Sequence, residues 1–440
     1  MIPFFGHNPE NIWQNLACRM VACALLLLGI LWTDDLMAED RIDSARGGGE
    51  TRELDEITPR SASVRLSTAP VVRLRDDRGA SPDFVYGTGR NLSLLQKAQD
   101  DRFQVGVVLP LTGEFSDLGQ DFLNAIILAL FDMGDETTSL LISDSQGTRE
   151  GAETAAVDVI LRGADVILGP VFDYTIAAAS PVSRGVNIPL IGFSANRHAV
   201  DDGVYLLNFS PEQQVARIVK FAIEQNIMRF AALIPEGSYG ALVAESFRDA
   251  VVQNGGEIIE IISYSDQFDQ LEAAAMQLAR SDIGEEGDAV FIPEGGTLLI
   301  TLVSFLTHYD IDPGVVRLLG TGLWDDPLLG REPSLRQGWF SSPSRHRDRH
   351  FQESFQAHMG HRPPRIVELG YDAFLIAALL QQQAGKGDNL SSLLIRDGGF
   401  TGINGLFRFL PNGLSERGLS IFEVQQHKMK EISPASSTFQ

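Results

Sequence analysis

Short apolar segments alternate with amphipathic ones from residue 103 onward. The first pair is the clearest, because residues 104–109 are apolar and β-branched, as in a buried strand, and Pro110 ends the run. Gly113 allows a sharp turn, and a helix with one apolar face is expected from about Ser116. Strand, glycine-containing loop and helix form the first unit of an open parallel sheet, in which ligands bind at the carboxyl ends of the strands.

The alternation continues to about residue 320. The strand-like segments are nearly continuous apolar runs, which is typical of parallel sheets covered by helices on both faces. About eight strands are too many for one small sheet, so the pattern predicts two similar lobes that separate near residues 208–211. After the first strand, we expect strands at 139–143, 164–168, 188–193, 230–234, 257–264, 289–292 and 315–319.

The first 101 residues follow a different pattern. Residues 20–32 form an apolar run too short for a comfortable membrane span, with Arg19 before it and Ala38 as a cleavage position after it. We expect residues 1–38 to be a signal peptide that exports the chain to the periplasm; an uncleaved membrane anchor is the alternative. Residues 39–101 are rich in Arg, Asp, Ser, Gly and Pro without an apolar period, which predicts a disordered linker.

Composition narrows the classes of function. The formal net charge of -23 repels nucleic-acid phosphates, so we expect no nucleic-acid partner. Both cysteines, Cys18 and Cys23, lie in the expected signal peptide, which leaves a mature chain without disulfides, thiol nucleophiles or cysteine metal ligands.

Motifs of catalysis are also missing from the sequence. It contains no nucleophile elbow, no phosphate-binding loop and no His-Glu-x-x-His motif. Asp325 and Asp326 are a candidate carboxylate pair, although a turn or a helix cap accounts for them more simply. We therefore expect a protein that is not an enzyme, with no cofactor and no metal.

Several motifs, in their order along the chain, resemble those of the leucine/isoleucine/valine-binding-protein family. The resemblance covers about 103–430 and implies the type I periplasmic-binding-protein fold: two Rossmann-like α/β lobes, joined by three crossovers, that close on a ligand. It places the first lobe in residues 102–209 plus 340–412 and the second in residues 210–339 plus 413–433. The motifs are Val105-Gly106-Val107-Val108-Leu109-Pro110-Leu111-Thr112-Gly113, Ile167-Leu168-Gly169-Pro170, Ile188-Pro189-Leu190-Ile191 with Ser194-Ala195, and Ser238-Tyr239-Gly240.

The same resemblance implies candidate ligand-binding positions in the cleft. An aromatic residue of the family falls on Leu118, and a second one falls on Gly295. A hydroxyl residue that holds the ligand carboxylate falls on Asp173, and Asn196 replaces a second hydroxyl. The family tyrosine is kept, as Tyr239. The acid that pairs with a ligand amine falls near Gly322, and Asp325 and Asp326 are close to that position in the sequence. The candidate residues are Leu118, Asp173, Ser194, Asn196, Tyr239, Gly295 and Asp325.

These departures from the family pattern argue against capture of a free amino acid. A zwitterion needs neutral donors around its carboxylate, and Asp173 would place a second anion there. Two aromatic walls are also missing, at Leu118 and Gly295.

A narrower resemblance is to the penicillin-binding-protein activator branch of the same superfamily. That branch implies a domain in the cell envelope that regulates a peptidoglycan synthase, its partner, by protein contact. The N-terminal helical-repeat domain of the best-known activators is not expected in this chain. The alternative is a receptor that delivers amino acids or another small solute to an ABC permease. The motifs are Gly322-Leu323-Trp324-Asp325-Asp326-Pro327, Gly338-Trp339-Phe340-Ser341-Ser342-Pro343 and Glu368-Leu369-Gly370-Tyr371-Asp372-Ala373.

Overall fold

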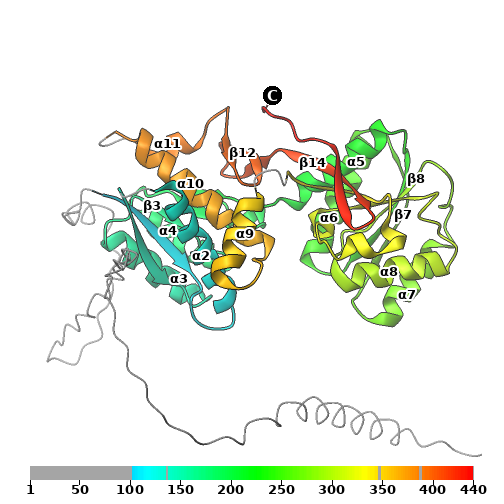
Figure 1. Cartoon of the computed structure of the whole chain (residues 1–440), viewed down its shortest axis with the longest axis horizontal. Coiled ribbons are helices and arrows are strands. Elements are labelled where there is room, and N and C mark those ends of the chain that lie inside the picture. The colour runs from blue at the N-terminus through cyan, green and yellow to red at the C-terminus, as the bar shows by residue number, and fades with distance from the viewer. Residues whose placement is uncertain (1–101, 135–136, 345–347, 386–388, 440) are drawn as a thin grey trace, which may run out of the picture. The chain divides into compact units, whose positions relative to one another are not determined.

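The computed structural model of the protein describes residues 102–134, 137–344, 348–385 and 389–439 (Figure 1). The expected signal peptide (1–38) and linker (39–101) lie outside the described residues. Within the described ranges, no helix combines the length and the apolar character needed to cross a membrane.

The first lobe is built on a five-stranded parallel sheet with the strand order β2-β1-β3-β4-β5. Apolar residues of α2 and α10 pack on one face, and those of α3 and α4 pack on the other. The strands are β1 (Phe103–Leu109), β2 (Thr138–Asp144), β3 (Val166–Leu168), β4 (Leu190–Gly192) and β5 (Val204–Leu206). The helices are α2 (Ser116–Met133), α3 (Arg149–Leu161), α4 (Asp173–Arg184), α9 (Asp348–Met359), α10 (Glu368–Gln383) and α11 (Leu390–Leu394), with short helices η2 (Arg197–Ala199) and η6 (Arg365–Val367).

The second lobe contains a seven-stranded sheet with the order β15-β14-β10-β9-β8-β6-β7. In this sheet β14 runs antiparallel to both of its neighbours, β10 and β15. Helices α7 and α8 cover one face, and α5 and α6 cover the other. The strands are β6 (Arg229–Pro235), β7 (Glu257–Tyr264), β8 (Asp288–Phe291), β9 (Arg317–Gly320), β10 (Trp339–Pro343), β14 (Leu419–Gln425) and β15 (Lys428–Ser433). The helices are α5 (Pro211–Glu224), α6 (Ser238–Gln253), α7 (Phe268–Leu278) and α8 (Gly296–His308), with short helices η3 (Gly322–Trp324), η4 (Leu329–Arg331) and η5 (Pro333–Leu335).

The chain passes between the two lobes after β5, after β10 and after a small third sheet. This third sheet consists of β11 (Phe400–Gly402), β12 (Gly405–Phe409) and β13 (Ser415–Arg417), and its phenylalanines belong to the core of the first lobe. The pairing corrects two expected boundaries. Residues 340–343 belong to the second lobe, because β10 pairs with β9 and β14, and residues 415–417 pair with β12.

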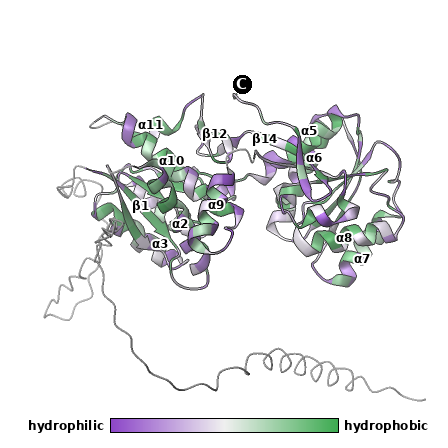
Figure 2. Ribbon diagram, viewed as in Figure 1, coloured by the Kyte–Doolittle hydropathy of each residue, from purple (hydrophilic) through white to green (hydrophobic). Residues whose placement is uncertain are grey.

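The first strand–loop–helix unit forms as the sequence predicts. Every residue of β1 from Gln104 to Leu109 is buried, and the strand is mostly apolar in Figure 2. Gly119 brings α2 close to the strand, since a Cβ there would lie 2.0 Å from the carbonyl oxygen of Pro110. The α/β fold with two lobes of parallel sheet is therefore confirmed.

Candidate functional site

Both sheets have a switch point at which the order of the strands changes direction. In the first lobe it lies between β1 and β3, and in the second between β6 and β8. Ligands of open α/β sheets bind at such points, outside the carboxyl ends of the strands. The segments that follow these four strands form the candidate functional site. We call them the strand-end loops: residues 110–115, 169–172, 236–237 and 292–295.

Aromatic rings gather at the strand-end loops of the first lobe. The ring centroids of Phe115 and Phe172 are 4.6 Å apart, and Phe172 stacks on Tyr174 at 5.5 Å. The hydroxyl of Tyr174 donates to the carbonyl of Gly147 at 2.9 Å. Leu118 instead lies in α2 and packs against the core. Leu118 is therefore not a ring at this loop, and the aromatic ring of the loop is that of Phe115, three residues earlier.

Asp144, at the end of β2, fixes the loop that carries Phe115. Its carboxylate accepts hydrogen bonds from the backbone N–H of Leu111 at 2.8 Å, from the hydroxyl of Thr112 at 2.6 Å and from the backbone N–H of Gln146 at 2.8 Å. Burial alone would raise the pKa of Asp144, but these hydrogen bonds outweigh it and hold the pKa below its ordinary value. The loop after β1 is thus held in place before any ligand arrives.

Asp173 and Asn196, two of the predicted residues, contact each other. The Nδ2 atom of Asn196 donates to Oδ2 of Asp173 at 2.6 Å, and the backbone N–H of Tyr174 donates to Oδ1 at 2.7 Å. Ser194 joins them, since its Oγ accepts from the backbone N–H of Asn196 at 3.1 Å. The carboxylate of Asp173 therefore accepts hydrogen bonds from donors at the start of α4. The family resemblance would put a ligand carboxylate at this position.

The second lobe contributes a cluster of tyrosines and one acid. The hydroxyl of Tyr264 donates to Oε2 of Glu294 at 3.1 Å, and Tyr239 lies 3.4 Å from the hydroxyl of Thr321. Burial raises the pKa of both tyrosines, so both are neutral phenols at physiological pH. Gly295, whose N–H donates to Oε1 of Glu294 at 3.0 Å, is the N-cap residue of α8.

Tyr264 and Glu294 were missed by the sequence reasoning. Tyr264 ends a predicted strand, and Glu294 directly precedes the candidate Gly295, so their positions at strand ends were the available signal. Glu294 is an acid at a strand-end loop of the second lobe.

Asp325 forms an ion pair with Arg365 of η6. The carboxylate, whose side chain is fully buried, also accepts from the hydroxyl of Ser342 at 3.1 Å. Arg365 donates to the same hydroxyl at 2.5 Å and to the carbonyl of Pro343 at 3.1 Å. Burial lowers the pKa of Arg365 to about 10, which leaves it charged. Asp325 thus connects the lobes and is paired within the protein, contrary to the expectation that it meets a ligand amine.

A second buried ion pair lies close to the first. Arg417 and Asp372, both almost inaccessible, are 3.7 Å apart, and Nε of Arg417 donates to the carbonyl of Asn208 at 2.8 Å. The ring of Phe209 is within 5.4 Å of the Arg365 guanidinium and within 5.0 Å of the Arg417 guanidinium. The buried Arg417 and the partly exposed Arg365 therefore both contact the aromatic residue of the first crossover.

Trp324, in a motif shared with the activator branch, belongs to the core. It is fully buried, and its Nε1 donates to the carbonyl of Ile292 at 3.1 Å. A Cβ at Gly320 would lie 2.2 Å from its ring, so the glycine makes room for the indole. This motif therefore serves packing at this position.

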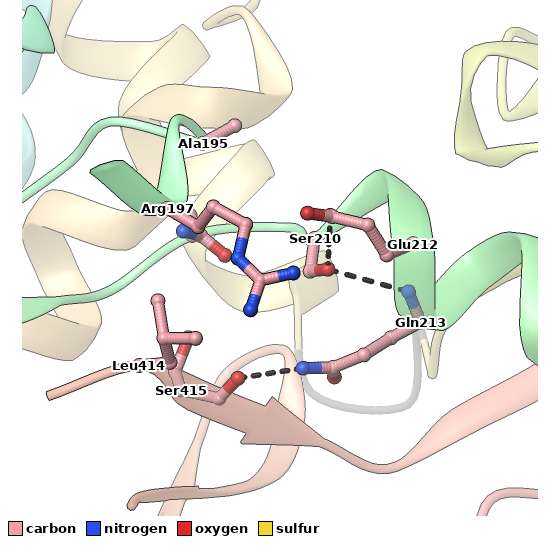
Figure 3. Close-up of a pocket in the computed structure, with 8 residues that line it drawn as sticks. Ala195, Arg197, Ser210, Glu212, Gln213, Leu414 and Ser415 are labelled. Carbon is pink, nitrogen blue, oxygen red and sulfur yellow. Dashed lines mark hydrogen bonds between the residues drawn. The ribbon is translucent and has the colours of Figure 1, made fainter. Parts of the chain in front are cut away.

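Two pockets lie at the crossovers. A larger one, of about 880 Å³, is lined by Asp325, Arg365 and Glu368 together with exposed charged residues of α9. A smaller one, of about 140 Å³, lies at the first crossover, and we call it the hinge pocket (Figure 3). The side chain of Arg197 extends into it between Ser210 and Leu414. The hinge pocket is lined by Ala195, Arg197, Asn208, Ser210, Glu212, Gln213, Leu414 and Ser415.

Metal ligands do not gather in the described part of the chain, where no group of three or more His, Cys, Asp or Glu side chains could hold an ion.

The chain belongs to a family of binding proteins. The profile of the family described as periplasmic binding protein matches residues 102–428. Among solved structures, a putative branched-chain amino acid ABC transporter protein from Rhodospirillum rubrum has a similar fold. Its TM-score is 0.66 at 17% identity, over 75% of this chain and 100% of that one.

The similar curated proteins match a smaller share of this chain than the solved structure does. An uncharacterised protein of Rickettsia prowazekii is 20% identical over 50% of this chain and 60% of its own length. A Leu/Ile/Val-binding protein homolog of Brucella melitensis is 22% identical over 46% of this chain and 54% of its own. The penicillin-binding protein activator LpoA of Vibrio cholerae is 26% identical over 32% of this chain and 24% of its own. The chain thus spans about half the length, or less, of the curated relatives that it matches.

Proposed function

We propose that the protein regulates peptidoglycan synthesis by direct contact with a peptidoglycan synthase, as a penicillin-binding-protein activator, and catalyses no reaction itself. Membership of the periplasmic binding protein family and the apolar run at residues 20–32 support export to the periplasm.

The contact between Asp173 and Asn196 carries the proposal. A receptor for amino acids needs free donors for the ligand carboxylate at the start of α4. Here the carboxylate of Asp173 accepts from the Asn196 amide at 2.6 Å and from the backbone N–H of Tyr174 at 2.7 Å. A ligand carboxylate would have to displace this side chain or lie beside its charge, and both are unfavourable. A domain of this fold that has given up amino-acid capture still offers a rigid surface for a protein partner.

Two further observations support the activator branch. The similarity to the Vibrio cholerae activator reaches 26% identity over 146 residues. Asp325 of the 322–327 motif accepts a hydrogen bond from the hydroxyl of Ser342, which belongs to the 338–343 motif, and both motifs resemble that branch. The Asp325 side chain is fully buried and paired with Arg365, which argues against a contact between Asp325 and a ligand amine.

Retention of a penicillin-binding synthase tests the proposal. The full chain, immobilised by a tag, is incubated with an envelope extract of its own organism that has been treated with fluorescent penicillin, which labels penicillin-binding synthases. We expect one labelled synthase to be retained and, once purified, to polymerise glycan faster when the full chain is added. Retention of no labelled protein, or an unchanged polymerisation rate, would contradict the proposal.

A second candidate function is that of a receptor for an ABC permease that binds amino acids or another small solute. It is favoured by the Phe115–Phe172 aromatic pair and by Glu294, which lies at a strand-end loop of the second lobe. For this function, leucine, isoleucine or valine should raise the melting temperature of the full chain, since a ligand that binds only the folded state stabilises it. The Glu294→Gln variant should lose that shift.

A further inference from the structure

Strand β7 leaves one edge of the seven-stranded sheet open. It is the last strand in the sheet order, and its residues 260–264 pair with β6 in unbroken register. The carbonyl of Tyr264 accepts from the backbone N–H of Glu236 at 2.8 Å, so the backbone groups of Tyr264 face β6. Because successive residues of a strand alternate in direction, the N–H and C=O groups of Ile261 and Ser263 face away from the sheet. We call these outward groups the β7 edge; within the described ranges, no residue forms a hydrogen bond with them.

The other three outer edges of the two large sheets are protected. At β2, the guanidinium of Arg162 donates to the carbonyl of Ile142 at 3.2 Å. At β5, the carbonyl of Gly413 accepts from the backbone N–H of Leu206 at 2.8 Å. Strand β15 contains two lysines, which oppose the addition of a further strand. Strand β7 has neither lysine nor proline, so its edge is the one that accepts another strand.

The sequence around the β7 edge is strongly acidic. Residues 257–272 contain five acids and no lysine or arginine. If a second copy of the chain paired with this edge through its own β7, like charges would oppose each other, which destabilises a strand pair. A segment rich in arginine and lysine would meet opposite charge instead. The acids are Glu257, Glu260, Asp266, Asp269 and Glu272.

An exposed aromatic residue follows β7 closely in the sequence. Phe268 begins α7, is 66% exposed and packs edge-on against Phe305, with the ring centroids 5.0 Å apart. Accessible aromatic rings are frequent anchors of protein interfaces. Phe268 therefore adds an apolar contact to the hydrogen-bonding groups and the charges of the β7 edge.

We propose that the β7 edge binds an extended basic segment of a partner protein by strand addition. The backbone of the segment pairs with Ile261 and Ser263, its arginines and lysines meet the surrounding acids, and an apolar side chain packs on Phe268. For the identity of the partner, a peptidoglycan synthase, this inference rests on the proposed function.

Calorimetric titration of the full chain with synthetic peptides tests the β7 edge without the synthase. The probe is a short peptide, blocked at both ends, in which valine and arginine alternate. One control peptide has glutamate in place of arginine, and the other has proline in place of every second valine, which keeps the charge but prevents pairing. We expect the probe to bind, with an affinity that falls as salt is added, and neither control to bind measurably.

Substitutions in the full chain locate the binding. Ser263→Pro removes the outward N–H and should raise the dissociation constant of the probe about tenfold, whereas Ser263→Ala keeps the N–H and should leave it unchanged. The double variant Glu257→Gln, Asp266→Asn should also raise it about tenfold, and Glu150→Gln, an exposed position of α3, should not. Thermal melting of each variant without peptide verifies that it is folded.

Several results would overturn the inference. They are no binding of the probe, binding that survives both Ser263→Pro and the double variant, and a dimer in analytical ultracentrifugation that Ser263→Pro dissociates, which would assign the edge to a second copy. Equal retention of the synthase by the unmodified chain and by Ser263→Pro would overturn it while the proposed function stands. No retention of the synthase by the unmodified chain would contradict the proposed function, and the peptide titration would still decide whether the edge binds a basic strand.

Discussion

Asp325 of the second lobe, whose side chain is fully buried, forms an ion pair with Arg365, which lies in η6 between helices of the first lobe. The pair shares the hydroxyl of Ser342, which donates to the carboxylate and accepts from the guanidinium. Two residues that are 40 positions apart in the sequence thereby tie one lobe to the other at the crossovers.

Removing one member of this pair should destabilise the protein strongly. Asp325→Ala leaves the Arg365 guanidinium charged and largely buried without its partner, which costs up to about 3–5 kcal/mol. The free energy of unfolding in urea measures the loss. Asp249→Ala, an exposed position of α6, is the matched control and should change stability by less than about 0.5 kcal/mol. If the double variant Asp325→Leu, Arg365→Met were no more stable than Asp325→Ala, the buried unpaired charge would not be the cause.

Replacing Asp173 should open the start of α4 to a ligand carboxylate. In Asp173→Ser, the Asn196 amide and the N–H of Tyr174 lose their intramolecular acceptor. We expect this variant to bind leucine at least about tenfold more tightly than the unmodified chain, because a negative charge leaves the place of the ligand carboxylate. Calorimetry of both proteins with leucine measures the difference. Asp202→Ser, at an exposed loop, should behave like the unmodified chain. Equal affinities for all three proteins would show that Asp173 does not block the site.

A histidine of the first lobe should make stability depend on pH. The Nε2 atom of His361 lies 3.1 Å from both carboxylate oxygens of Asp121, and this hydrogen bond raises the pKa of His361 above 6.5. A histidine with a raised pKa in the folded state stabilises it at pH below 6.5, and this stabilisation disappears as the pH rises through the folded pKa. Melting temperatures of the unmodified chain and of His361→Gln should therefore differ at pH 5.5 and converge near pH 8.

The same pH-dependent difference should appear in Asp121→Asn, which removes the acceptor and keeps the imidazole. Combining both substitutions should add no further pH dependence, because each already removes the pair. A difference in melting temperature that grows with rising pH would contradict the assignment.

The buried indole of Trp324 should contribute more to stability than its neighbour. Trp324→Ala leaves a cavity in the second lobe and an unpaired carbonyl at Ile292, with an expected loss of about 3–5 kcal/mol. Leu323→Ala is the control, since Leu323 is 48% exposed, and should cost less than about 0.5 kcal/mol. Urea unfolding of both variants measures the two losses. Similar values would mean that Trp324 is not the packing centre of its motif.

The fold could be predicted from the sequence where the strands are apolar and long enough to give a recognisable pattern. β1, β6 and β7 are close to their predicted ranges, because seven or more residues of β-branched or apolar character leave little ambiguity. β5 has only three residues and gave no periodic signal. The strands after residue 400 contain many polar residues. Their pairing partners depend on which of the two lobes each strand belongs to, and the local sequence pattern does not show this.

The candidate site, like the fold, could be predicted from the sequence only in part. The family resemblance made Asp173 and Asn196 separate candidates for the cleft, and the structure brings their side chains into contact. The contact between Phe115 and Phe172 could not be predicted, because the two rings are far apart in the sequence and meet only in the folded lobe. Asp325 could not be assigned from sequence, since its partner Arg365 comes from another lobe and is brought near only by the tertiary fold.

Parallel titrations with a synthase and with an amino acid distinguish the two functions: contact with a synthase, and capture of an amino acid at the strand-end loops. The purified full chain is titrated in parallel with a purified peptidoglycan synthase and with leucine. The account predicts saturable binding of the synthase and no binding of leucine. Binding of leucine at micromolar concentrations that is lost in Glu294→Gln, together with no binding of the synthase, would contradict it.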